Sequence, residues 1–266
     1  MTTELEHDGQ DAPARHLAPQ RQQRVLDIVI SRRAARLEDL ASALGVSVAT
    51  ARRDLDELAS RGLLRRVHGG AVALDAQREP HFEAKTADAA LEKERIAARA
   101  VGLLAPDDTV YLDSGSTVLA AARLLRGWDR LTVVTNSLPI ANELGGHGPT
   151  VIMIGGEFRP TSQAFVGPLS RHLLENLHVT KALIGTYALS LEDGLSTTDA
   201  AEAFTKALAV ERATEVIVLA DSRKLGAHSF AHAGRLDQVD VLVTDTGIDD
   251  HLAQTLQQAG ITVIKA

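Results

Sequence analysis

The 266-residue sequence predicts an α/β protein in two parts, a small helical module with a β-hairpin and a larger domain with a mainly parallel sheet. Three observations predict it. Apolar residues recur at helical spacing three times between residues 20 and 62, and a strand–turn–strand pattern follows them. A polar segment over residues 76–92 then interrupts the pattern and is interpreted as a linker. Beyond it, from 93 to 266, short apolar strands alternate with helical stretches, as in βαβ units.

The composition indicates a soluble globular protein. Hydrophobic residues make up 45% of the chain and charged residues 24%, and there is no cysteine. No apolar run approaches the ~20 residues needed to cross a bilayer, and the first residues lack a signal-peptide pattern. We therefore expect a cytoplasmic protein without disulfides or a membrane partner.

The net charge of −7 hides an uneven distribution. Residues 21–70 contain ten arginines and six acidic residues, a local balance of +4, whereas the rest of the chain has 18 basic and 29 acidic residues, or −11. A basic segment of this length is typical of a nucleic-acid-binding module within an otherwise acidic protein. The composition alone is equally compatible with a solvated, arginine-rich surface.

Within residues 20–75 the expected elements follow one another closely. Residues 1–19 are polar and aperiodic and are predicted to be a disordered tail. A first helix begins near Gln20, and a second ends at Gly45. Ser47 is placed to cap a third helix that ends at Gly62, and the segment 63–74 reads as a hairpin with glycines at its turn.

This order of elements is that of a winged helix-turn-helix, whose third helix enters the DNA major groove. Arginine can donate two hydrogen bonds to guanine there, and hydroxyls near the helix start can hold a phosphate. Asp54, Asp56 and Glu57 would repel DNA and end the contact surface. The competing interpretation is a solvated helix face with an Arg53–Glu57 pair. The candidate DNA-contacting residues are Ser47, Thr50, Arg52, Arg53, Arg65, Arg66, His68 and Gly69.

In the larger domain the expected strands and helices alternate. The strands are predicted at 109–112, 131–134, 151–154, 182–184, 216–219, 239–243 and 261–264. The helices are predicted at 93–104, 118–126, 170–176, 201–213 and 250–259. Polar residues and glycines cluster where the strands end, and the carboxyl ends of parallel strands form the ligand crevice of such folds.

These strand ends supply the candidate ligand-binding residues. The turn after the first strand places hydroxyls and backbone N–H groups at the start of a helix, and this arrangement can bind phosphate. It could equally be a simple βα turn, and Glu202 and Lys206 could form an i,i+4 surface pair. The strand-end candidates are Asp113, Ser114, Gly115, Ser116, Thr117, Thr135, Asn136, Ser137, Gly155, Gly156 and Gly185.

A metal site is not expected. Only His228 and His232 among the ten histidines have i,i+4 spacing, and residues 227–233 lack a helical pattern. The sequence also contains no signature of a bound cofactor, and we assign no catalytic residue.

The sequence resembles the DeoR family of bacterial transcriptional repressors. The first part carries the resemblance in the segment VSVATARRDLDEL and in the turn HGGA, and the second part carries it in LDSGST, VVTNS, IGGEFRP, FVGPL, EDGLSTTDAAEAFTKAL and VIVLADSRKLG. The resemblance implies a C-terminal domain similar in fold to ribose-5-phosphate isomerase that binds a phosphorylated sugar. It places residues 114–117 around the phosphate. As candidates for the sugar hydroxyls or the cleft it adds Asp113, Asn136, Glu202, Lys206, Asp221 and Lys224. Tyr187 departs from the family's more glycine-rich run and leaves the sugar's identity open.

We therefore expect a repressor of carbohydrate metabolism that binds operator DNA under the control of a sugar phosphate. The alternative is a sugar-phosphate isomerase or deaminase fused to a DNA-binding domain, because folds do not fix function. One winged module reads only a short site, so we expect a homodimer or homotetramer.

Overall fold

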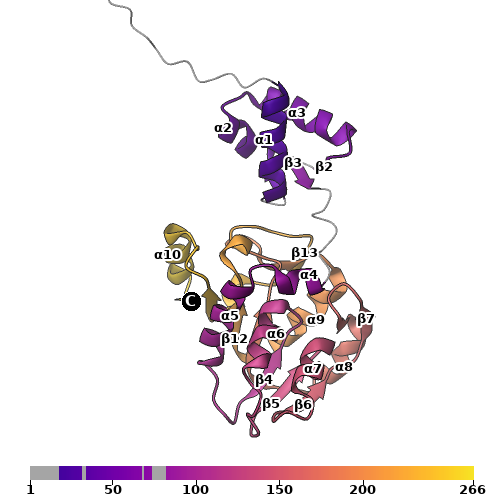
Figure 1. The fold of residues 1–266 in the computed structure, drawn as a ribbon, viewed down its shortest axis with the longest axis vertical. Coiled ribbons are helices and arrows are strands. Elements are labelled where there is room, and N and C mark those ends of the chain that lie inside the picture. Colours follow the sequence, from indigo (N-terminus) through magenta and orange to yellow (C-terminus); the bar gives the residue numbers. More distant parts are fainter. Residues whose placement is uncertain (1–17, 32–33, 68, 74–81) are drawn as a thin grey trace, which may run out of the picture. The chain divides into compact units, whose positions relative to one another are not determined.

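In a computed structural model, the described residues are 18–31, 34–67, 69–73 and 82–266, and the chain divides into two compact units, Met1–Arg78 and Glu79–Ala266. Figure 1 shows both units along the chain. Most of the expected tail, the wing residue His68, residues 74–75 at the end of the predicted winged module and residues 76–81 of the expected linker lie outside the described residues.

Within its described residues, the first unit contains three helices and a small antiparallel sheet. The helices are α1 (Ala18–Ser31), α2 (Leu37–Leu44) and α3 (Val48–Ser60). The strands are β1 (Ala34–Arg36), β2 (Leu64–Val67) and β3 (Gly70–Ala73), in the order β1-β3-β2. The three predicted helices and the hairpin are confirmed, and β1 is an addition that the sequence patterns did not indicate.

Apolar side chains from all three helices and the hairpin form the core of this unit. Val25, Leu40, Leu55 and Leu64 are fully buried in it. The predicted turns use glycine for different reasons. Gly45 ends α2 with a positive φ of 62°, whereas at Gly70 a Cβ atom would overlap the carbonyl oxygen of Ala35 on β1. The wing therefore packs on β1 through a position that has room only for glycine.

A seven-stranded parallel sheet forms the centre of the second unit. Its order is β15-β14-β12-β9-β4-β5-β6, so the first strand of the unit, β4, lies inside the sheet. All seven predicted strands are confirmed to within a few residues. Their bounds are β4 (Thr109–Leu112), β5 (Thr132–Thr135), β6 (Thr150–Met153), β9 (Val179–Gly185), β12 (Ala213–Leu219), β14 (Val241–Thr244) and β15 (Thr262–Lys265).

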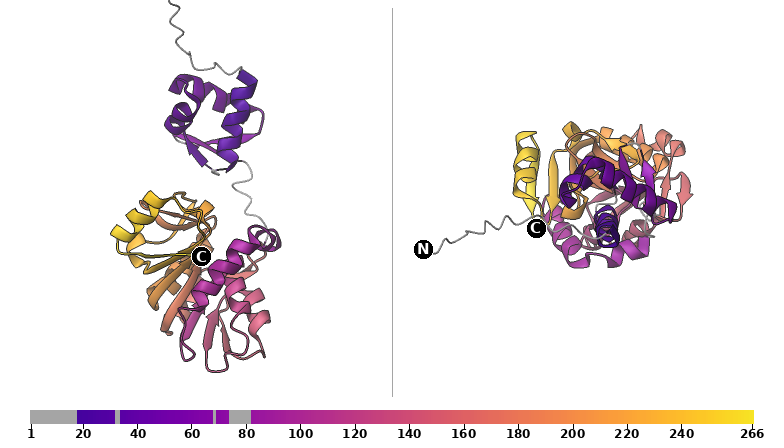
Figure 2. Two further views of the ribbon diagram at one scale, coloured as in Figure 1. Left: turned by 60° about the vertical axis from the view of Figure 1, so that its left-hand side comes forward. Right: turned by 90° about the horizontal axis from the view of Figure 1, so that it is seen from above.

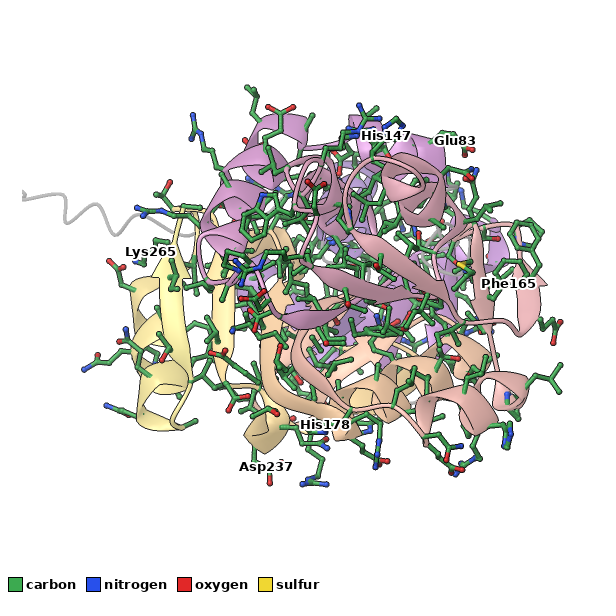
Figure 3. All side chains as sticks on the ribbon, turned by 90° about the horizontal axis from the view of Figure 1, so that it is seen from below. Glu83, His147, Phe165, His178, Asp237 and Lys265 are labelled. Carbon is green, nitrogen blue, oxygen red and sulfur yellow. The ribbon has the colours of Figure 1, made fainter. Side chains whose placement is uncertain are left out.

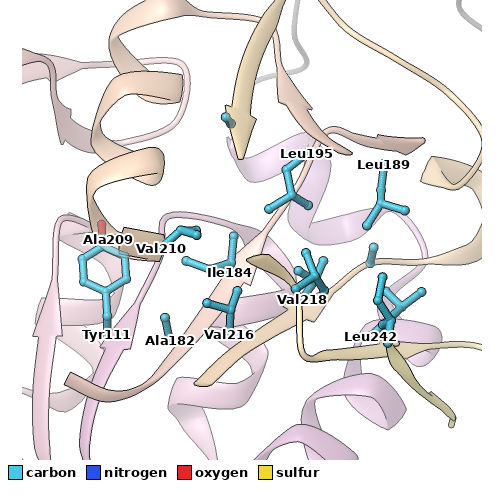
Figure 4. Packing of buried hydrophobic residues seen from close by; sticks show 14 of the residues in the cluster. Tyr111, Ala182, Ile184, Leu189, Leu195, Ala209, Val210, Val216, Val218 and Leu242 are labelled. Atoms are coloured by element: carbon cyan, nitrogen blue, oxygen red, sulfur yellow. The ribbon is translucent and has the colours of Figure 1, made fainter. Parts of the chain in front are cut away.

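Helices cover both faces of this sheet (Figure 2). Helices α5 (Ala90–Val101), α6 (Ser116–Arg123) and α7 (Leu138–Leu144) pack on one face, and α8 (Arg171–Leu174), α9 (Ala200–Glu211) and α10 (Asp250–Gln258) pack on the other. Side chains of each strand alternate between the two cores: Leu183 lies with α5 and α6, and its neighbour Ile184 lies with α9. Figure 4 shows the α9 side, with Tyr111 and Val218 among its buried residues.

Several short elements were not predicted. Helix α4 (Phe82–Ala87) lies within the expected linker and buries Phe82, so that interpretation is wrong for residues 82–92, which pack in the second unit. Strands β7 (Glu157–Arg159) and β8 (Ala164–Val166) form a two-stranded hairpin, and the 3₁₀ helix η2 (Pro168–Ser170) follows it. Strands β10 (Ala188–Ser190), β11 (Gly194–Thr197) and β13 (Ala231–Gly234) form a separate antiparallel sheet.

Replacing Gly70 by alanine should destabilise the first unit by about 1–3 kcal/mol, because the new methyl group meets backbone that cannot move aside easily. Calorimetric melting of the full chain would measure the loss of stability, and hydrogen exchange would identify the transition that belongs to the first unit. Gly155→Ala is the control, since a Cβ there meets open space. Equal stability of the two variants would show that the wing does not depend on this close approach.

Candidate nucleic-acid interface and ligand crevice

Helix α3 presents two arginines to solvent. Its inner face consists of Ala51, Asp54, Leu55 and Leu58, all buried, which leaves Arg52 and Arg53 on the outer side. Both are exposed, and within the described residues neither forms a hydrogen bond or an ion pair, so the expected alternative of an Arg53–Glu57 pair does not occur there. The two guanidinium groups are therefore available for a partner.

The amino end of α3 is capped as predicted. Ser47 Oγ accepts a hydrogen bond from the backbone N–H of Thr50 at 3.2 Å, and the hydroxyls of these two residues lie 2.9 Å apart. At the start of the helix, Ser47 is exposed and Thr50 is half-buried. The other N–H groups of this first turn keep their positive ends directed outward, which favours an anion.

The acidic residues of α3 are held by other parts of the first unit. Asp54 is buried and accepts hydrogen bonds from Arg21 at 2.5 and 3.0 Å, and this contact raises the pKa of the Arg21 guanidinium. Glu57 accepts a bond from Gln22 at 2.8 Å. The expectation of a DNA-repelling edge is wrong for Asp54, because its carboxylate faces α1 rather than solvent.

The two wing arginines differ, as the alternation of a strand predicts. Arg65 is exposed, whereas Arg66 is half-buried and donates a hydrogen bond to the carbonyl of Gly70 at 2.7 Å. Arg66 also pairs with Asp56 on α3 at 2.8 Å. The Arg66 side chain joins α3 to the wing turn, and its predicted contact with DNA stays a prediction. Gly69 is exposed with a φ of 82°, in the turn.

The second unit has its topological switch at β4, with β5 on one side and β9 on the other. In such sheets the loops that follow the two strands at the switch diverge and leave a crevice. We use the name ligand crevice for the loops 113–117 and 185–187. Gly115 and Gly185 face each other here, since a Cβ on Gly115 would lie 3.8 Å from the Gly185 Cα. Gly115 precedes the first residue of α6.

A buried ion pair lies at the base of the ligand crevice. The Lys206 ammonium on α9 donates to Asp113 Oδ2 and, at 2.7 Å, to the carbonyl of Gly185. The backbone N–H of Gly185 donates to the same carboxylate oxygen at 3.0 Å. Both charged side chains are only 2–3% exposed. The alternative of an i,i+4 pair between Glu202 and Lys206 is therefore wrong.

Glu202 lies one turn earlier on α9 and binds a different set of groups. It accepts hydrogen bonds from Ser114 Oγ at 3.5 Å and from Thr197 Oγ1 at 3.3 Å, and the Arg159 guanidinium lies 3.6 Å away. Arg159 comes from strand β7 and lies 3.4 Å from Asp199, which caps α9. Glu202 thus connects the predicted phosphate loop to the β7–β8 hairpin.

The hydroxyl of Tyr111 is buried beside these acids without a hydrogen-bond partner among the described residues. Burial, and then the negative charges of Asp113 and Glu202, raise the pKa of Tyr111 well above its usual range. Tyr111 was not predicted as a site residue, because a tyrosine in an apolar strand is indistinguishable from a core residue in sequence.

Asp221 and Lys224 belong to a second polar cluster, at the ends of β12 and β14. Asp221 is buried, with Arg223 Nε at 2.9 Å and Lys224 Nζ at 3.6 Å. Burial lowers the pKa of Lys224 to about 8 and also lowers the pKa of Lys93 on α5. The negative charge of Asp221 opposes both shifts, and neighbouring cations add smaller effects in the direction of burial. A cleft of about 290 Å³ opens beside the cluster, lined by Ala89, Glu92, Asp221, Ser222, Arg223 and Asp245.

Lys93 is the clearest residue that sequence reasoning missed. It is buried on the same helical stripe as Ile96, Ala97 and Ala100, at spacings of three, four and seven residues. A lysine inside an apolar stripe was the available signal, because such a position normally holds an aliphatic residue. Its ammonium donates to the backbone carbonyls of Lys85 and Asp88.

The remaining strand-end candidates make internal contacts. Thr135 donates to the carbonyl of Leu112 at 2.7 Å, and Ser137 caps α7 by accepting from the N–H of Ile140 at 3.5 Å. The Asn136 side-chain amide donates to the carbonyl of Phe165 at 3.0 Å. Gly155 is exposed, and a Cβ on Gly156 would press on the backbone of Val166. Ser116 and Thr117 are buried in the first turn of α6.

The described residues contain no cluster of three or more histidine or acidic side chains arranged to hold a metal. His228 is exposed outside any helix, and His232 is exposed in β13, so the two are not a helical pair. Within the same residues, none of the helices has both the length and the apolar character that crossing a membrane requires.

Comparison with known proteins gives consistent matches over both units. Residues 21–77 match the family model of the DeoR-like helix-turn-helix domain, and residues 88–246 match that of the DeoR C terminal sensor domain. The HTH-type transcriptional regulator GlpR of Haloferax volcanii is 36% identical over 93% of this chain and 98% of its own length. The lactose phosphotransferase system repressor of Streptococcus mutans is 32% identical over 88% of this chain and 94% of its own. A solved D-ribose-5-phosphate isomerase bound to phospho-erythronic acid is 20% identical, with a TM-score of 0.38 over 50% of this chain and 52% of that one.

Replacing Lys206 by methionine should destabilise the second unit by about 3–5 kcal/mol, because Asp113 would remain as an uncompensated buried charge. Urea denaturation would measure the loss. Combining Lys206→Met with Asp113→Asn should recover much of it. The control is Arg130→Ala, which breaks the exposed Arg130–Asp107 pair and should cost no more than about 0.5 kcal/mol. A single variant as stable as this control would contradict the structural role of the buried pair.

Proposed function

Because the chain belongs to the DeoR family of transcriptional regulators, we propose that it represses a sugar-catabolism operon by binding operator DNA through its first unit. A phosphorylated sugar bound in the second unit controls this affinity. Two observations together carry the proposal. An arginine pair on α3 faces solvent, and in the second unit desolvation lowers the pKa of Lys93 and Lys224, so that a bound anion would stabilise their charged forms.

In the DNA complex, the amino-terminal half of α3 lies in the major groove. Arg52 and Arg53 are adjacent and therefore diverge by ~100° around the helix, so one reads a base edge while the other contacts a phosphate. Ser47 and the first-turn N–H groups hold a second phosphate. On the wing, Arg65 contacts the DNA backbone, and Arg66 keeps the wing aligned with α3 through Asp56.

In the effector complex, the phosphate lies between the start of α6 and the lysines of the second polar cluster. Desolvation is the chief cause of the lowered pKa of buried Lys93 and of half-buried Lys224, whose side chain is 28% exposed, and a phosphate dianion would stabilise their charged forms. The N–H groups that follow Gly115 add donors at a helix amino end. Glu202, which accepts a hydrogen bond from Ser114, and Asn136 are the candidates for the sugar hydroxyls.

We propose binding without turnover at this site. The acids and the lysine that could transfer protons are committed to each other, with Lys206 bound to Asp113 and Glu202 bound to Ser114 and Thr197. Assays for isomerisation or deamination of aldose and amino-sugar phosphates should give no product above background. Sustained turnover would favour the alternative of an enzyme fused to a DNA-binding unit.

Arg52→Ala or Arg53→Ala should reduce the preference for the operator over random DNA, by about 1–3 kcal/mol for the arginine that reads a base. Arg65→Ala should weaken binding to all sequences evenly and flatten the salt dependence. Gel-shift titrations on the protein's own promoter region, at several salt concentrations, would separate these effects. Arg61→Ala removes the same charge at the far end of α3 and is the control. Absence of any sequence-specific shift at moderate salt would refute the proposed function.

Affinity for the effector should fall as the pH rises through about 8. Lys224 has a lowered pKa in the free protein, and an anion binds its protonated form, so binding takes up a proton when the pH is near or above that value. The phosphate ester itself titrates near about 6 and does not contribute in this range. After a thermal-shift screen of phosphosugars, calorimetry in buffers of different ionisation enthalpy would count the proton. Lys224→Met should remove the proton uptake, and Lys265→Met, at an exposed ion pair with Asp250, should not.

A further inference from the structure

The predicted phosphate loop is buried within the second unit. Ser114, Ser116 and Thr117 are all less than a tenth exposed. Thr186, in the facing loop of the ligand crevice, is buried to the same degree. A sugar phosphate is much larger than the gaps between packed side chains, so it reaches these residues only if a covering element moves.

Helix α4 has the position of such an element. It packs against α6, whose first turn belongs to the phosphate loop. At one end, Glu83 accepts a hydrogen bond from the side chain of Gln163, in the turn between β7 and β8. Figure 3 shows Glu83 toward the same side of the unit as Phe165, which follows this turn. At the other end, Asp88 pairs with Arg223 at 2.9 Å.

The sheet order places these two contacts on either side of the ligand crevice. Arg223 follows β12, and Gln163 is held beyond the end of β5 because its carbonyl accepts from the N–H of Leu138 on α7 at 3.0 Å. The strands run in the order β12-β9-β4-β5, and the two crevice loops follow β9 and β4. Three strand spacings are about 14 Å, and a helix of the length of α4 covers about 9 Å, so the side chains at its ends complete the span.

Backbone strain coincides with the two ends of this span. Among the described residues other than glycine, only Ala89 and Gln163 have a positive φ, of 49° and 50°. Ala89 joins α4 to α5, and Gln163 is the residue that binds Glu83. A side chain with a Cβ atom makes this conformation unfavourable, so it persists only where surrounding contacts impose it, and it is typical of segments that switch.

The carboxyl end of α4 is bound by cations that the proposed effector site also uses. Lys93 on α5 donates hydrogen bonds to the carbonyl oxygens of Lys85 and Asp88. Arg223, which holds the Asp88 carboxylate, lines the cleft beside the second polar cluster. The donors of each cation are few, so an anion that binds Lys93 and Arg223 competes with α4 for them.

We propose that residues 82–89 are a strap that closes the ligand crevice, and that the effector's phosphate releases the strap by competing for Lys93 and Arg223. Release displaces the point at which the second unit begins, directly after the residues that follow the wing. The role of the effector rests on the proposed function. Closure of the crevice by the strap is a property of the free chain, so it can be measured without DNA.

The chain contains no cysteine, so a single introduced thiol reports on one position. Ser116→Cys places a thiol beneath the strap. Ser170→Cys places one at another buried position, where the native hydroxyl lies beside Thr205 on α9. In the full chain, the rate of modification by iodoacetamide measures how often each position opens.

Glu83→Ala frees one end of the strap and should speed modification at position 116 by about threefold or more, as expected for loss of an exposed charged contact. Asp88→Ala frees the other end and should act in the same direction. The matched control is Glu94→Ala, which removes the same charge at an exposed position of α5 and should leave the rate unchanged. None of the three changes should alter the rate at position 170.

Hydrogen exchange of the cysteine-free chain tests the release. Inorganic phosphate, compared with chloride at equal ionic strength, should speed exchange of residues 82–89, although bound ligands ordinarily slow exchange. If Ser116→Cys does not fold, exchange of residues 114–118 in the Glu83→Ala, Asp88→Ala and Glu94→Ala chains replaces the labelling, with the same expected order.

The proposal is overturned if neither Glu83→Ala nor Asp88→Ala speeds modification at position 116, or if Glu94→Ala speeds it as much. An equal increase at position 170 also overturns it, because the unit would then be loosened as a whole. Phosphate that slows exchange of the strap, or leaves it unchanged, overturns the release. A chain whose strap opens as described but that binds no operator refutes the proposed function alone.

Discussion

The buried contact between Lys206 and Asp113 is the interaction on which the ligand crevice depends. Removing two opposite charges from water costs several kcal/mol each, and their attraction offsets this only when further hydrogen bonds complete the geometry. The N–H and carbonyl of Gly185 supply those bonds, so α9 is held over the ends of β4 and β9 together. Glu202, one turn earlier, is thereby directed toward Ser114.

In the first unit, ion pairs join α3 to the elements around it. Asp54 on α3 pairs with Arg21 on α1, and Asp56 on α3 pairs with Arg66 on β2. These pairs fix the angle of α3 against α1 and the wing. Because the carboxylates are neutralised internally, the exposed Arg52 and Arg53 give the helix a positive outer surface within an acidic chain.

The β7–β8 hairpin contacts α9, although Arg159 and Glu202, which form this contact, are more than forty residues apart in the sequence. One side of the ribbon meets Glu202 through Arg159, and the other carries Phe158 and Phe165 outward. Because Arg159 and Phe158 are neighbours on β7, a single strand joins the polar inner side of the hairpin to its apolar outer side.

The sequence by itself determined the regular elements and their order. Periodicity identified all seven parallel strands, and the capping residue Ser47 and the stop at Gly45 placed the helices of the first unit, because these signals act within a few residues. Short elements such as α4, the β7–β8 hairpin and the β10–β11–β13 sheet were not predicted, since they are stabilised by contacts with residues distant in sequence. Strand-end chemistry also indicated where the crevice lies.

Only the tertiary structure decided which side chains interact. Lys206 pairs with Asp113 rather than with Glu202, Arg66 pairs with Asp56, and Lys93 lies near enough to Lys224 to affect its pKa. Side chains far apart in sequence meet according to which strand ends are neighbours in the sheet, and that order is set by the packing of the whole unit.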